Sequence, residues 1–354
     1  MRTIILFVAF GTTLLAALVV MRVTGGPLAR TTSRPAADPV VPSGHSIEPQ
    51  TLDVSQDGRW VAYVSREERG DRSPLVFHLL DSRKGKEIDL STIAPDASSG
   101  QFSPDGKNLL VLCRSKGGML LRSLALKTLK ATDLCRGGHL SAVWVGSSIA
   151  VTEVTSDREF KHLKVVSPDG GKTEETPICG AAIAADQQGR VRVVAAWAAD
   201  PTKAVTVEDK SKLSFLAMDA KWRKLAVLGT IGRVGSMVWI SPSGKYVAYQ
   251  RRPAGKGMHY TVAVQSTDGK EEREIDAFAL PLAITDSGGV LATKATFTPG
   301  STLWFCEKGN TKPTELSEHV RDAALVGSRI YYVHSVVTDR IKSTLKMMDL
   351  PESK

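Results

Sequence analysis

Ser103-Pro104-Asp105-Gly106-Lys107 stands immediately before the run Leu109-Leu110-Val111-Leu112, with Asn108 between them. Ser241-Pro242-Ser243-Gly244-Lys245 precedes Tyr246-Val247-Ala248-Tyr249, and Gln56-Asp57-Gly58-Arg59 precedes Trp60-Val61-Ala62-Tyr63-Val64. Proline presets φ for a β-turn, Asp or Ser bonds the following backbone, and glycine tolerates a positive φ. The three stretches therefore predict tight turns that each lead into a β-strand.

The turn recurs along the chain in a constant register. Weaker copies join the three clear ones, so that the series reads Gly58, Gly106, Gly146, Gly189, Gly244, Gly288 and Gly327. Three residues after the glycine stands a branched aliphatic residue in every copy except the fourth, which has Arg192. The spacing brackets the roughly 40–45 residues of one four-stranded propeller blade. The pattern predicts a repeat protein with one unit for each glycine.

Most units contain a second pair of β-forming runs, and helical periods are few. Four strands per unit predict an all-β protein. One such sheet cannot bury both of its faces alone, whereas a radial arrangement buries each sheet between two neighbours. We therefore predict a seven-bladed β-propeller over residues 47–354, with six or eight blades as alternatives.

The Ser-Pro-Asp-Gly-Lys and Ser-Pro-Ser-Gly-Lys units resemble the WD40-like (PD40) repeats of TolB-type β-propellers. The resemblance covers roughly residues 47 to 350 and is good in the first, second and fifth units, but the third and seventh lack both Pro and Asp. It implies a propeller fold and says little about chemistry. Related repeats occur in the propeller that gates prolyl-oligopeptidase-type enzymes, yet the Gly-x-Ser-x-Gly motif of a hydrolase domain is absent from this sequence.

Charge and cysteine content exclude several classes of function. The formal net charge is +9, but basic residues alternate with acidic ones, as in Arg66-Glu67-Glu68-Arg69, so no nucleic-acid partner is predicted. The four cysteines show no Cys-x-x-Cys spacing and the seven histidines form no close pair. We therefore predict buried free thiols, no metal site, no cofactor and no catalytic residue.

The amino terminus predicts export. Residues 4–21 form a run without charge that is just long enough to cross a bilayer as a helix. Residues 1–23 are therefore predicted to be a helical membrane anchor or a cleaved signal peptide. Residues 24–46 contain several prolines and are predicted to be an extended linker. The propeller is thus expected to be anchored in the membrane by residues 4–21, or released to the periplasm or extracellular space after cleavage.

The two ends of the repeat region suggest how the ring closes. The last unit stops after a predicted third strand at residues 343–349. A propeller needs closure to avoid a large exposed edge. We therefore predict that residues 40–47 pair with the last blade. The fourth unit is the longest, and residues 213–228 are predicted to be an added hairpin or a twisted outer strand.

Candidate site residues follow from the register and from a fold-level analogy. Propellers usually bind ligands at one end of the central channel, on loops that enter the innermost strands. We predict that six polar residues at this mouth bind a ligand or partner: Asp53, Gln101, His139, Arg233, Arg321 and Asp322. The alternative is that Arg–Asp pairs merely satisfy the channel entrance together with water.

These observations together predict a non-enzymatic, monomeric binding module of the cell envelope. The expected partner is another envelope protein, or a peptide or sugar ligand, and the membrane is reached through the N-terminal segment. The alternative is a propeller enzyme, lactonase-like or glycosidase-like, with its site at the channel mouth.

Overall fold

Strands are the regular elements of this protein. The computed structural model describes residues 45–48, 51–67, 75–155, 157–206, 209, 212–230, 234–251, 260–275, 279–295, 301–310, 312–337 and 341–351. Within these ranges the structure contains strands β1 to β26 and no helix long and apolar enough to cross a membrane. The all-β prediction is confirmed. The helix predicted in residues 1–23 and the linker up to residue 44 lie outside the described residues.

The strands form five antiparallel sheets. The first and second sheets contain β1 (His45–Ile47), β2 (Asp53–Val54), β3 (Trp60–Glu67), β4 (Leu75–Asp81) and β5 (Lys86–Asp89), then β6 (Ala97–Phe102), β7 (Asn108–Ser115), β8 (Gly118–Ala125) and β9 (Lys130–Gly137). The third sheet contains β10 (His139–Val145), β11 (Ser148–Val154), β12 (His162–Val166), β13 (Thr173–Ala185), β14 (Val191–Trp197), β15 (Leu213–Asp219) and β16 (Lys224–Thr230).

The fourth and fifth sheets complete the chain. The fourth contains β17 (Val234–Ile240), β18 (Tyr246–Arg251), β19 (Thr261–Ser266) and β20 (Glu272–Ile275). The fifth contains β21 (Ala279–Ile284), β22 (Val290–Ala295), β23 (Ser301–Cys306), β24 (Thr314–Val326), β25 (Arg329–Val337) and β26 (Ile341–Asp349).

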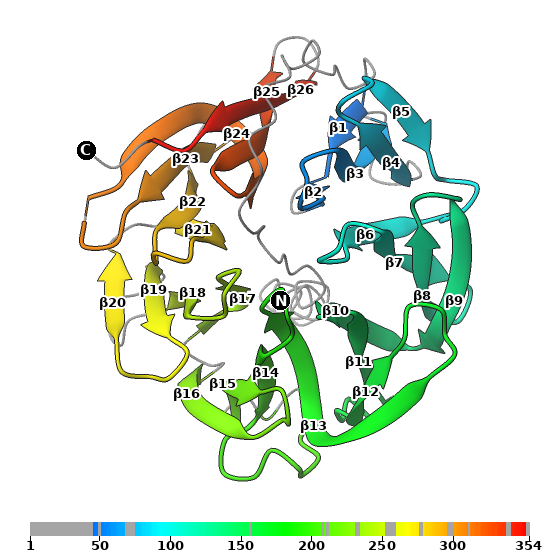
Figure 1. Ribbon diagram of the computed structural model, residues 1–354, viewed down its shortest axis with the longest axis vertical. Helices are drawn as coiled ribbons and strands as arrows, with labels where there is room; N and C mark the ends of the chain where they lie inside the picture. Colours follow the sequence, from blue (N-terminus) through cyan, green and yellow to red (C-terminus); the bar gives the residue numbers. More distant parts are fainter. Residues whose placement is uncertain are drawn as a thin grey trace, which may run out of the picture.

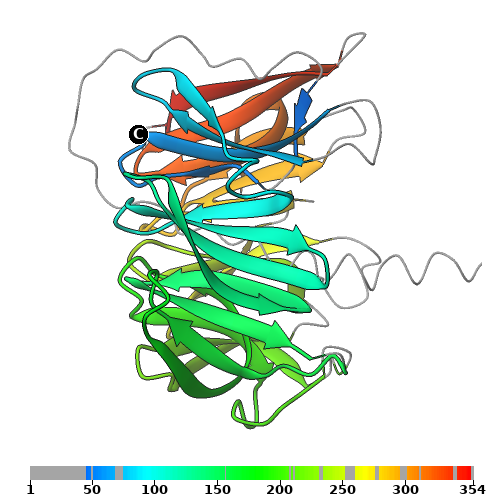
Figure 2. The same ribbon diagram turned by 90° about the vertical axis from the view of Figure 1, so that its right-hand side faces the viewer.

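The sheets stand side by side around a central axis. Figure 1 shows β2, β6, β10, β17 and β21 near the axis and β5, β9, β16 and β20 at the outer rim. Figure 2 shows the same ring edge on. Apolar side chains pack between neighbouring sheets, so that Ala62 and Phe77 of the first sheet join Leu109 and Val111 of the second in one buried cluster. The result is a propeller-like ring.

The glycine turns have the chemistry that the sequence predicts. Ser103 Oγ donates to Asp105 Oδ1 (2.7 Å) and accepts from the backbone N–H of Asn108 (2.9 Å). Asp105 Oδ1 in turn accepts from the N–H of Lys107 at 3.1 Å, and Gly106 has φ of +66°. These side-chain bonds occupy backbone donors that no strand partner reaches, and glycine carries the left-handed backbone.

Glycine also allows two turns to meet. A Cβ atom on Gly189 would lie 2.6 Å from the carbonyl carbon of Val145, and one on Gly146 would lie 2.9 Å from the carbonyl oxygen of Gln188. The β10–β11 turn and the β13–β14 turn therefore pack backbone against backbone. The repeat spacing reflects this contact as well as the turn conformation.

Two long strands join parts of the ring that would otherwise be separate sheets. Residues 173–179 of β13 pair with β12, and residues 180–185 pair with β14. In the same way, residues 314–320 of β24 pair with β23, and residues 320–326 pair with β25. Hydrogen bonding is thus continuous from β10 to β16 and from β21 to β26.

The closing strand has a different partner from the one predicted. β1 pairs with β3, with His45 opposite Glu67 and Ile47 opposite Ser65. The prediction that this segment pairs with the last blade is therefore wrong for residues 45–47, and residues 40–44 lie outside the described residues. The reason is geometric: β2 is only two residues long and covers part of the edge of β3, so β1 fills the remainder.

Two further predictions concern strand identity. The third strand predicted at residues 343–349 is confirmed as β26. Residues 213–228, predicted to be an added hairpin or a twisted outer strand, form β15 and most of β16, the two outer strands that follow β14. The extra length of this unit lies in the connection from residue 198 to residue 212.

Candidate functional site

Three of the predicted site residues link neighbouring sheets. Asp322 is 1% exposed, and its Oδ2 accepts from the backbone N–H of Leu52 at 2.8 Å. Asp53 Oδ2 accepts from the N–H of Phe102 at 2.7 Å. Gln101 Oε1 accepts from the N–H of Trp144 at 3.3 Å. Each residue stands five positions before its turn glycine, and each reaches the backbone of the next repeat unit.

These three hydrogen bonds cross three consecutive junctions of the ring, from the fifth sheet to the first, from the first to the second, and from the second to the third. A buried backbone N–H without a partner is costly, so these contacts stabilise the junctions. The three side chains are thus arranged along the inner strands and are occupied by structural hydrogen bonds. Their role in ligand binding stays a prediction.

Of the other three predicted residues, two lie in the described part of the chain. His139 is the exposed first residue of β10, opposite Val154, and Arg321 is half-buried on β24 beside Asp322. Arg233 lies outside the described residues. The sequence register therefore identified inner-strand positions correctly, but it did not define one cluster.

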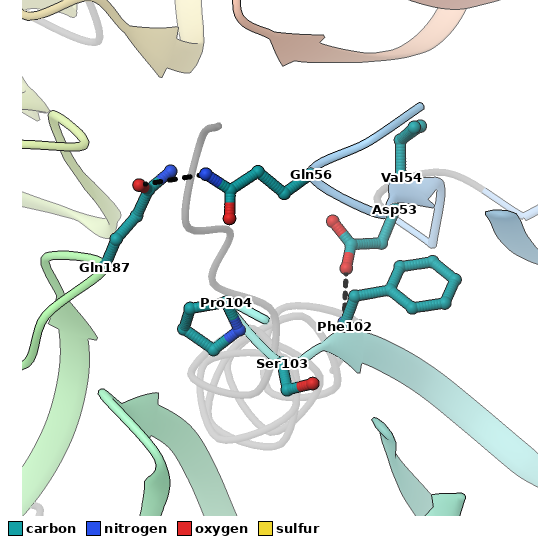
Figure 3. A pocket seen from close by; sticks show the side chains of 7 residues that line it. All are labelled: Asp53, Val54, Gln56, Phe102, Ser103, Pro104 and Gln187. Atoms are coloured by element: carbon teal, nitrogen blue, oxygen red, sulfur yellow. Dashed lines mark hydrogen bonds between the residues drawn. The ribbon is translucent and has the colours of Figure 1, made fainter. Parts of the chain in front are cut away.

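Turn residues of three repeat units meet around one small space (Figure 3). Gln56 Nε2 donates to Gln187 Oε1 at 3.4 Å, which joins the first and fourth units. The space beside this pair has a volume of about 10 Å³, which holds about one water molecule. Its lining consists of turn and inner-strand residues: Asp53, Val54, Gln56, Phe102, Ser103, Pro104 and Gln187.

Gln56 and Gln187 are not among the predicted site residues. Both, like Pro104, occupy the second position of a turn, two residues before the glycine. The predicted residues Asp53, Gln101 and Asp322 instead stand five positions before the glycine, within the inner strands. The second turn position follows from the same register and marks the end of the channel at the turns.

A larger pocket opens between the fourth and fifth sheets. Its volume is about 230 Å³. The residues that line it come from β18, β19, β20 and the loops after β21 and β23: Tyr246, Val264, Ser266, Glu271, Glu272, Arg273, Gly288, Lys308 and Gly309. Tyr246 and Val264 are each 3% exposed and supply an apolar wall.

Opposite charges meet at the rim of this pocket. Lys308 Nζ donates to the Tyr246 hydroxyl at 2.6 Å and to Glu271 Oε2 at 2.9 Å, and the same hydroxyl donates to Glu271 Oε2 at 3.1 Å. The hydrogen bonds from Lys308 and Tyr246 lower the pKa of Glu271. The ammonium groups of Lys308 and Lys245 lie 4.8 and 5.1 Å from the centre of the Tyr246 ring. A cation placed above the face of an aromatic ring is attracted to it.

Arg273 holds the loops at the base of this pocket in place. One guanidinium nitrogen donates to the carbonyl oxygens of Glu307 (2.9 Å) and Asn310 (3.2 Å), and the other donates to that of Gly288 (2.6 Å). A planar guanidinium fits several acceptors at once with little loss of freedom. The pocket is therefore formed before any ligand arrives.

A chain of side chains in the first sheet has the order of a hydrolytic triad. Ser65 Oγ lies 2.7 Å from His78 Nε2, and His78 Nδ1 lies 2.8 Å from Glu87 Oε1. Because a carboxylate only accepts, Nδ1 carries the proton, and in the neutral ring Nε2 accepts from Ser65. Hydrogen bonding from His78 is the main cause that lowers the pKa of Glu87.

Burial gives the Ser65–His78–Glu87 network a structural role. Ser65 is 0% and His78 is 5% exposed, so no substrate reaches the hydroxyl. Tyr63 stacks on His78 with ring centres 4.7 Å apart and donates to Glu87. Burial raises the pKa of Tyr63 far above its usual value, and the contact with Glu87 adds to this effect. The network joins β3, β4 and β5.

Metal and thiol chemistry find no support in the described part of the chain. Among those residues, no group of three or more His, Cys, Asp or Glu side chains is placed to hold a metal ion. All four cysteines are free, and of these Cys135 is half-buried while Cys113, Cys179 and Cys306 are buried. The prediction of free thiols is confirmed, and that of burial holds for three of them.

Comparison with known proteins shows the class of fold. No protein-family model matches the chain, and no curated protein matches its sequence. Among solved structures, the β-propeller domain of the Trilobed protease from Pyrococcus furiosus, which has an open velcro topology, is similar with a TM-score of 0.59 and 14% identity. The match covers 86% of this chain and 98% of that chain.

Peptidase structures are similar to a comparable degree. An acylaminoacyl peptidase from Pyrococcus horikoshii has a TM-score of 0.57 and 16% identity over 85% of this chain and 52% of its own. A prolyl endopeptidase has a TM-score of 0.56 and 16% identity over 86% of this chain and 47% of its own. The chain thus spans about half the length of these peptidases. At such identities the likeness defines a β-propeller and no activity.

TolB is among the solved structures that match. The structure of TolB from Acinetobacter baumannii has a TM-score of 0.47 and 16% identity, over 66% of this chain and 53% of its own. That score is too low to support an argument about function.

Proposed function

We propose that this protein is a non-enzymatic binding module whose ligand occupies the pocket between the fourth and fifth sheets. The observation that carries the proposal is the preformed space of about 230 Å³, with an apolar wall and a charged rim. The small space beside Gln56 and Gln187 holds about one water molecule. A ligand therefore has more surface to bury in the pocket than in that space.

The size of the pocket favours one class of ligand. Pockets for small molecules are typically about 300–1,000 Å³, so this one suits a small body such as one large apolar side chain. We propose that a partner protein inserts such a side chain against Tyr246 and Val264. Lys308 and Glu271 at the rim can then bond the backbone carbonyl and N–H groups of the partner. Aromatic and aliphatic anchors of this kind commonly dominate protein interfaces.

Catalysis has weaker support. An active site needs convergent titratable groups that a substrate can reach. The Ser65–His78–Glu87 chain has the right order but a buried nucleophile. No other observation on the described residues favours a lactonase or a glycosidase over a binding role.

The cellular setting belongs to the proposal. The uncharged run at residues 4–21 supports export, with the ring either anchored by that run or released after cleavage into the periplasm or extracellular space. The partner would then be another envelope protein, and the ring would act as a monomer. Protease added to intact cells, with the outer layer opened, would digest an exported ring and spare an internal one.

We also propose a count of seven blades. In the third sheet, β13 pairs with β12 along its first half and with β14 along its second half. In the fifth sheet, β24 pairs with β23 and then with β25 in the same way. Division at these strands yields seven groups of three to five strands, one for each glycine turn. An experimental structure with six or eight such groups would contradict this count.

The binding role is tested with the tagged full chain and membranes dissolved in a gentle detergent. We expect a stoichiometric partner, which Val264→Phe releases because the larger side chain fills the pocket. Lys308→Met, which leaves the core untouched, is expected to weaken capture as well. Lys312→Met, at an exposed lysine outside the pocket, is the matched control. Failure to recover a partner, or equal recovery by all variants, contradicts the proposal.

A further inference from the structure

The outer strand β16 exposes aliphatic side chains. Leu225 is 48% and Val227 is 46% exposed, and with Val336 they are the large hydrophobic residues that the described part of the chain leaves open to solvent. Two of these three residues therefore lie on one strand of seven residues. Single exposed hydrophobic residues are ordinary, but two on one edge strand need an explanation.

Other outer strands are protected by charge. β5 presents Lys86, Glu87 and Asp89 at exposed or half-exposed positions. β20 is likewise exposed at Glu272 and Glu274. Charged residues on an edge strand prevent it from pairing with another chain. β16 carries one charge, Lys224, at its first position.

β16 also has a free edge within the described structure. It lies at the end of the third sheet and pairs with β15 alone among the described strands, and of its carbonyl groups that of Leu228 accepts from the Tyr249 hydroxyl at 2.7 Å. An edge of this kind presents backbone N–H and C=O groups that an extended peptide can bond. This surface is separate from the pocket between the fourth and fifth sheets, because that pocket contains no residue of β16.

The approach to β16 is basic. Lys221, Arg223 and Lys224 are exposed at its start, and Asp219 forms an ion pair with Arg223 there at 2.6 Å. Arg192 adds a further cation, which stacks on Trp222 with its guanidinium 4.1 Å from the ring centre. An acidic segment would therefore be attracted to this end of the strand.

We propose that β16 accepts an extended, acidic and apolar segment of a partner protein by β-strand addition. Main-chain hydrogen bonds along the free edge would hold the segment, and its apolar residues would cover Leu225 and Val227. Its carboxylates would pair with Lys221 and Lys224. The charge at this edge sets the choice of partner, because the backbone bonds themselves are the same for any sequence.

Two other occupants fit the charge less well. Residues 24–44 of this chain contain Arg30 and Arg34 against the single acid Asp38. A second copy of β16 would bring another basic strand without any acidic residue. A partner segment rich in Asp or Glu is complementary where these two are not.

The experiment uses the full chain in detergent and a fluorescent peptide of alternating valine and glutamate. We expect saturable binding that weakens with added salt, as ion pairing at an exposed site requires. Val227→Glu is expected to weaken binding by about tenfold or more, because burial of one aliphatic side chain is lost and a like charge is placed against the acidic peptide. Val336→Glu, at the exposed aliphatic position on β25, is the matched control and is expected to bind like the wild type.

Hydrogen exchange identifies the mode of binding. We expect the peptide to slow amide exchange in residues 224–230 and not in the first sheet. A peptide of alternating valine and lysine that binds equally well would overturn the choice of an acidic partner. Unchanged exchange in β16 would overturn strand addition. A dimer in sedimentation that Val227→Glu dissociates would assign the edge to a second copy instead. Lys308→Met is expected to leave peptide binding intact, which separates this proposal from the one about the pocket.

Discussion

Two junctions of the ring are built in different ways. Within the third sheet, a single strand of 13 residues, β13, pairs with β12 through one half and with β14 through the other. Between the fifth sheet and the first, no described strand is shared, and β1 and β2 both pair with β3. The first junction has a shared backbone strand in addition to its side-chain bonds, whereas the second depends on side chains. The closing junction is therefore where we expect the ring to open first.

The closing junction is nevertheless well packed. Asp322 accepts from the N–H of Leu52, and the Tyr331 hydroxyl donates to the carbonyl oxygen of Gly58 at 3.3 Å. Around these bonds lies one buried cluster from both sheets: Ile47, Leu52, Val54, Val61, Tyr63, Leu80, Ala324, Val326, Tyr331, Val333 and Leu345. The comparison teaches that an apolar interface with a few directed bonds can replace a shared strand.

The largest expected effect follows from removal of the buried carboxylate at the closing junction. Asp322→Ala leaves the N–H of Leu52 without its acceptor in a buried place, and we expect a loss of about 3 kcal/mol in the free energy of unfolding. Urea denaturation measures this loss. Asp349→Ala, whose side chain is 74% exposed on β26, is the control and is expected to change stability by about 0.5 kcal/mol or less. Equal losses of unfolding free energy in the two variants would contradict the stabilising role of the Asp322 carboxylate.

A second prediction concerns the junction with the shared strand. Gly189→Ala forces a Cβ to within 2.6 Å of the Val145 backbone at a φ of +68°, and we expect a loss of about 2–3 kcal/mol. Gly85→Ala has a similar φ of +61° with nothing within 4 Å, so only the conformational cost of about 1 kcal/mol is expected. Thermal denaturation of both variants separates packing from backbone strain. If the two variants lose equal free energy of unfolding, the contact between the turns does not contribute to stability.

A smaller effect is expected for the second bond of the closing junction. Tyr331→Phe removes the hydroxyl that donates to Gly58 and should cost about 0.5–1 kcal/mol. Combined with Asp322→Ala in a double-mutant cycle, it shows whether the two contacts act together. A coupling energy indistinguishable from zero would mean that the two hydrogen bonds stabilise the closing junction independently.

The smallest effect concerns the interior of the first sheet and its response to pH. The hydrogen bonds from His78 and Tyr63 lower the pKa of Glu87 from its ordinary value of 4.5. The carboxylate therefore adds stability that is fully present above that value and is lost as the pH falls through the lower, folded-state pKa. Stability measured from neutral to acidic pH should decline less steeply in Glu87→Gln than in the wild type. Parallel curves for the two proteins would exclude this contribution.

Local turn chemistry could be predicted from the sequence, but ring closure could not. Ser103, Asp105 and Gly106 determine their turn through neighbouring atoms, so the pattern was sufficient. Asp53 and Asp322 stand at the same register position of the first and last units, and the bond from the N–H of Leu52 to Asp322 joins these two units. The partner of β1 depends on how much of the edge of β3 is left open, which no repeat pattern records.

The candidate sites were harder to predict for a related reason. Tyr246, Glu271 and Lys308 come from separate turns and loops, and only the packing of two sheets brings them together. Gln56 and Gln187 shared a readable position in the turn, but nothing in the sequence gave that position priority. Leu225 and Val227 have the residue types of a core strand, and their exposure follows from the place of β16 at the outer rim.

Native-state hydrogen exchange tests the difference between the two junctions most directly. The measurement compares the amide of Leu52, which bonds Asp322 at the closing junction, with the amide of Ala182 in β13, which donates to Thr152 Oγ1 at 2.9 Å. We predict that Leu52 exchanges through a local opening of lower free energy than Ala182, and that Asp322→Ala lowers that free energy further while Ala182 remains protected. Equal opening free energies at the two amides, lowered together by Asp322→Ala, would contradict the account.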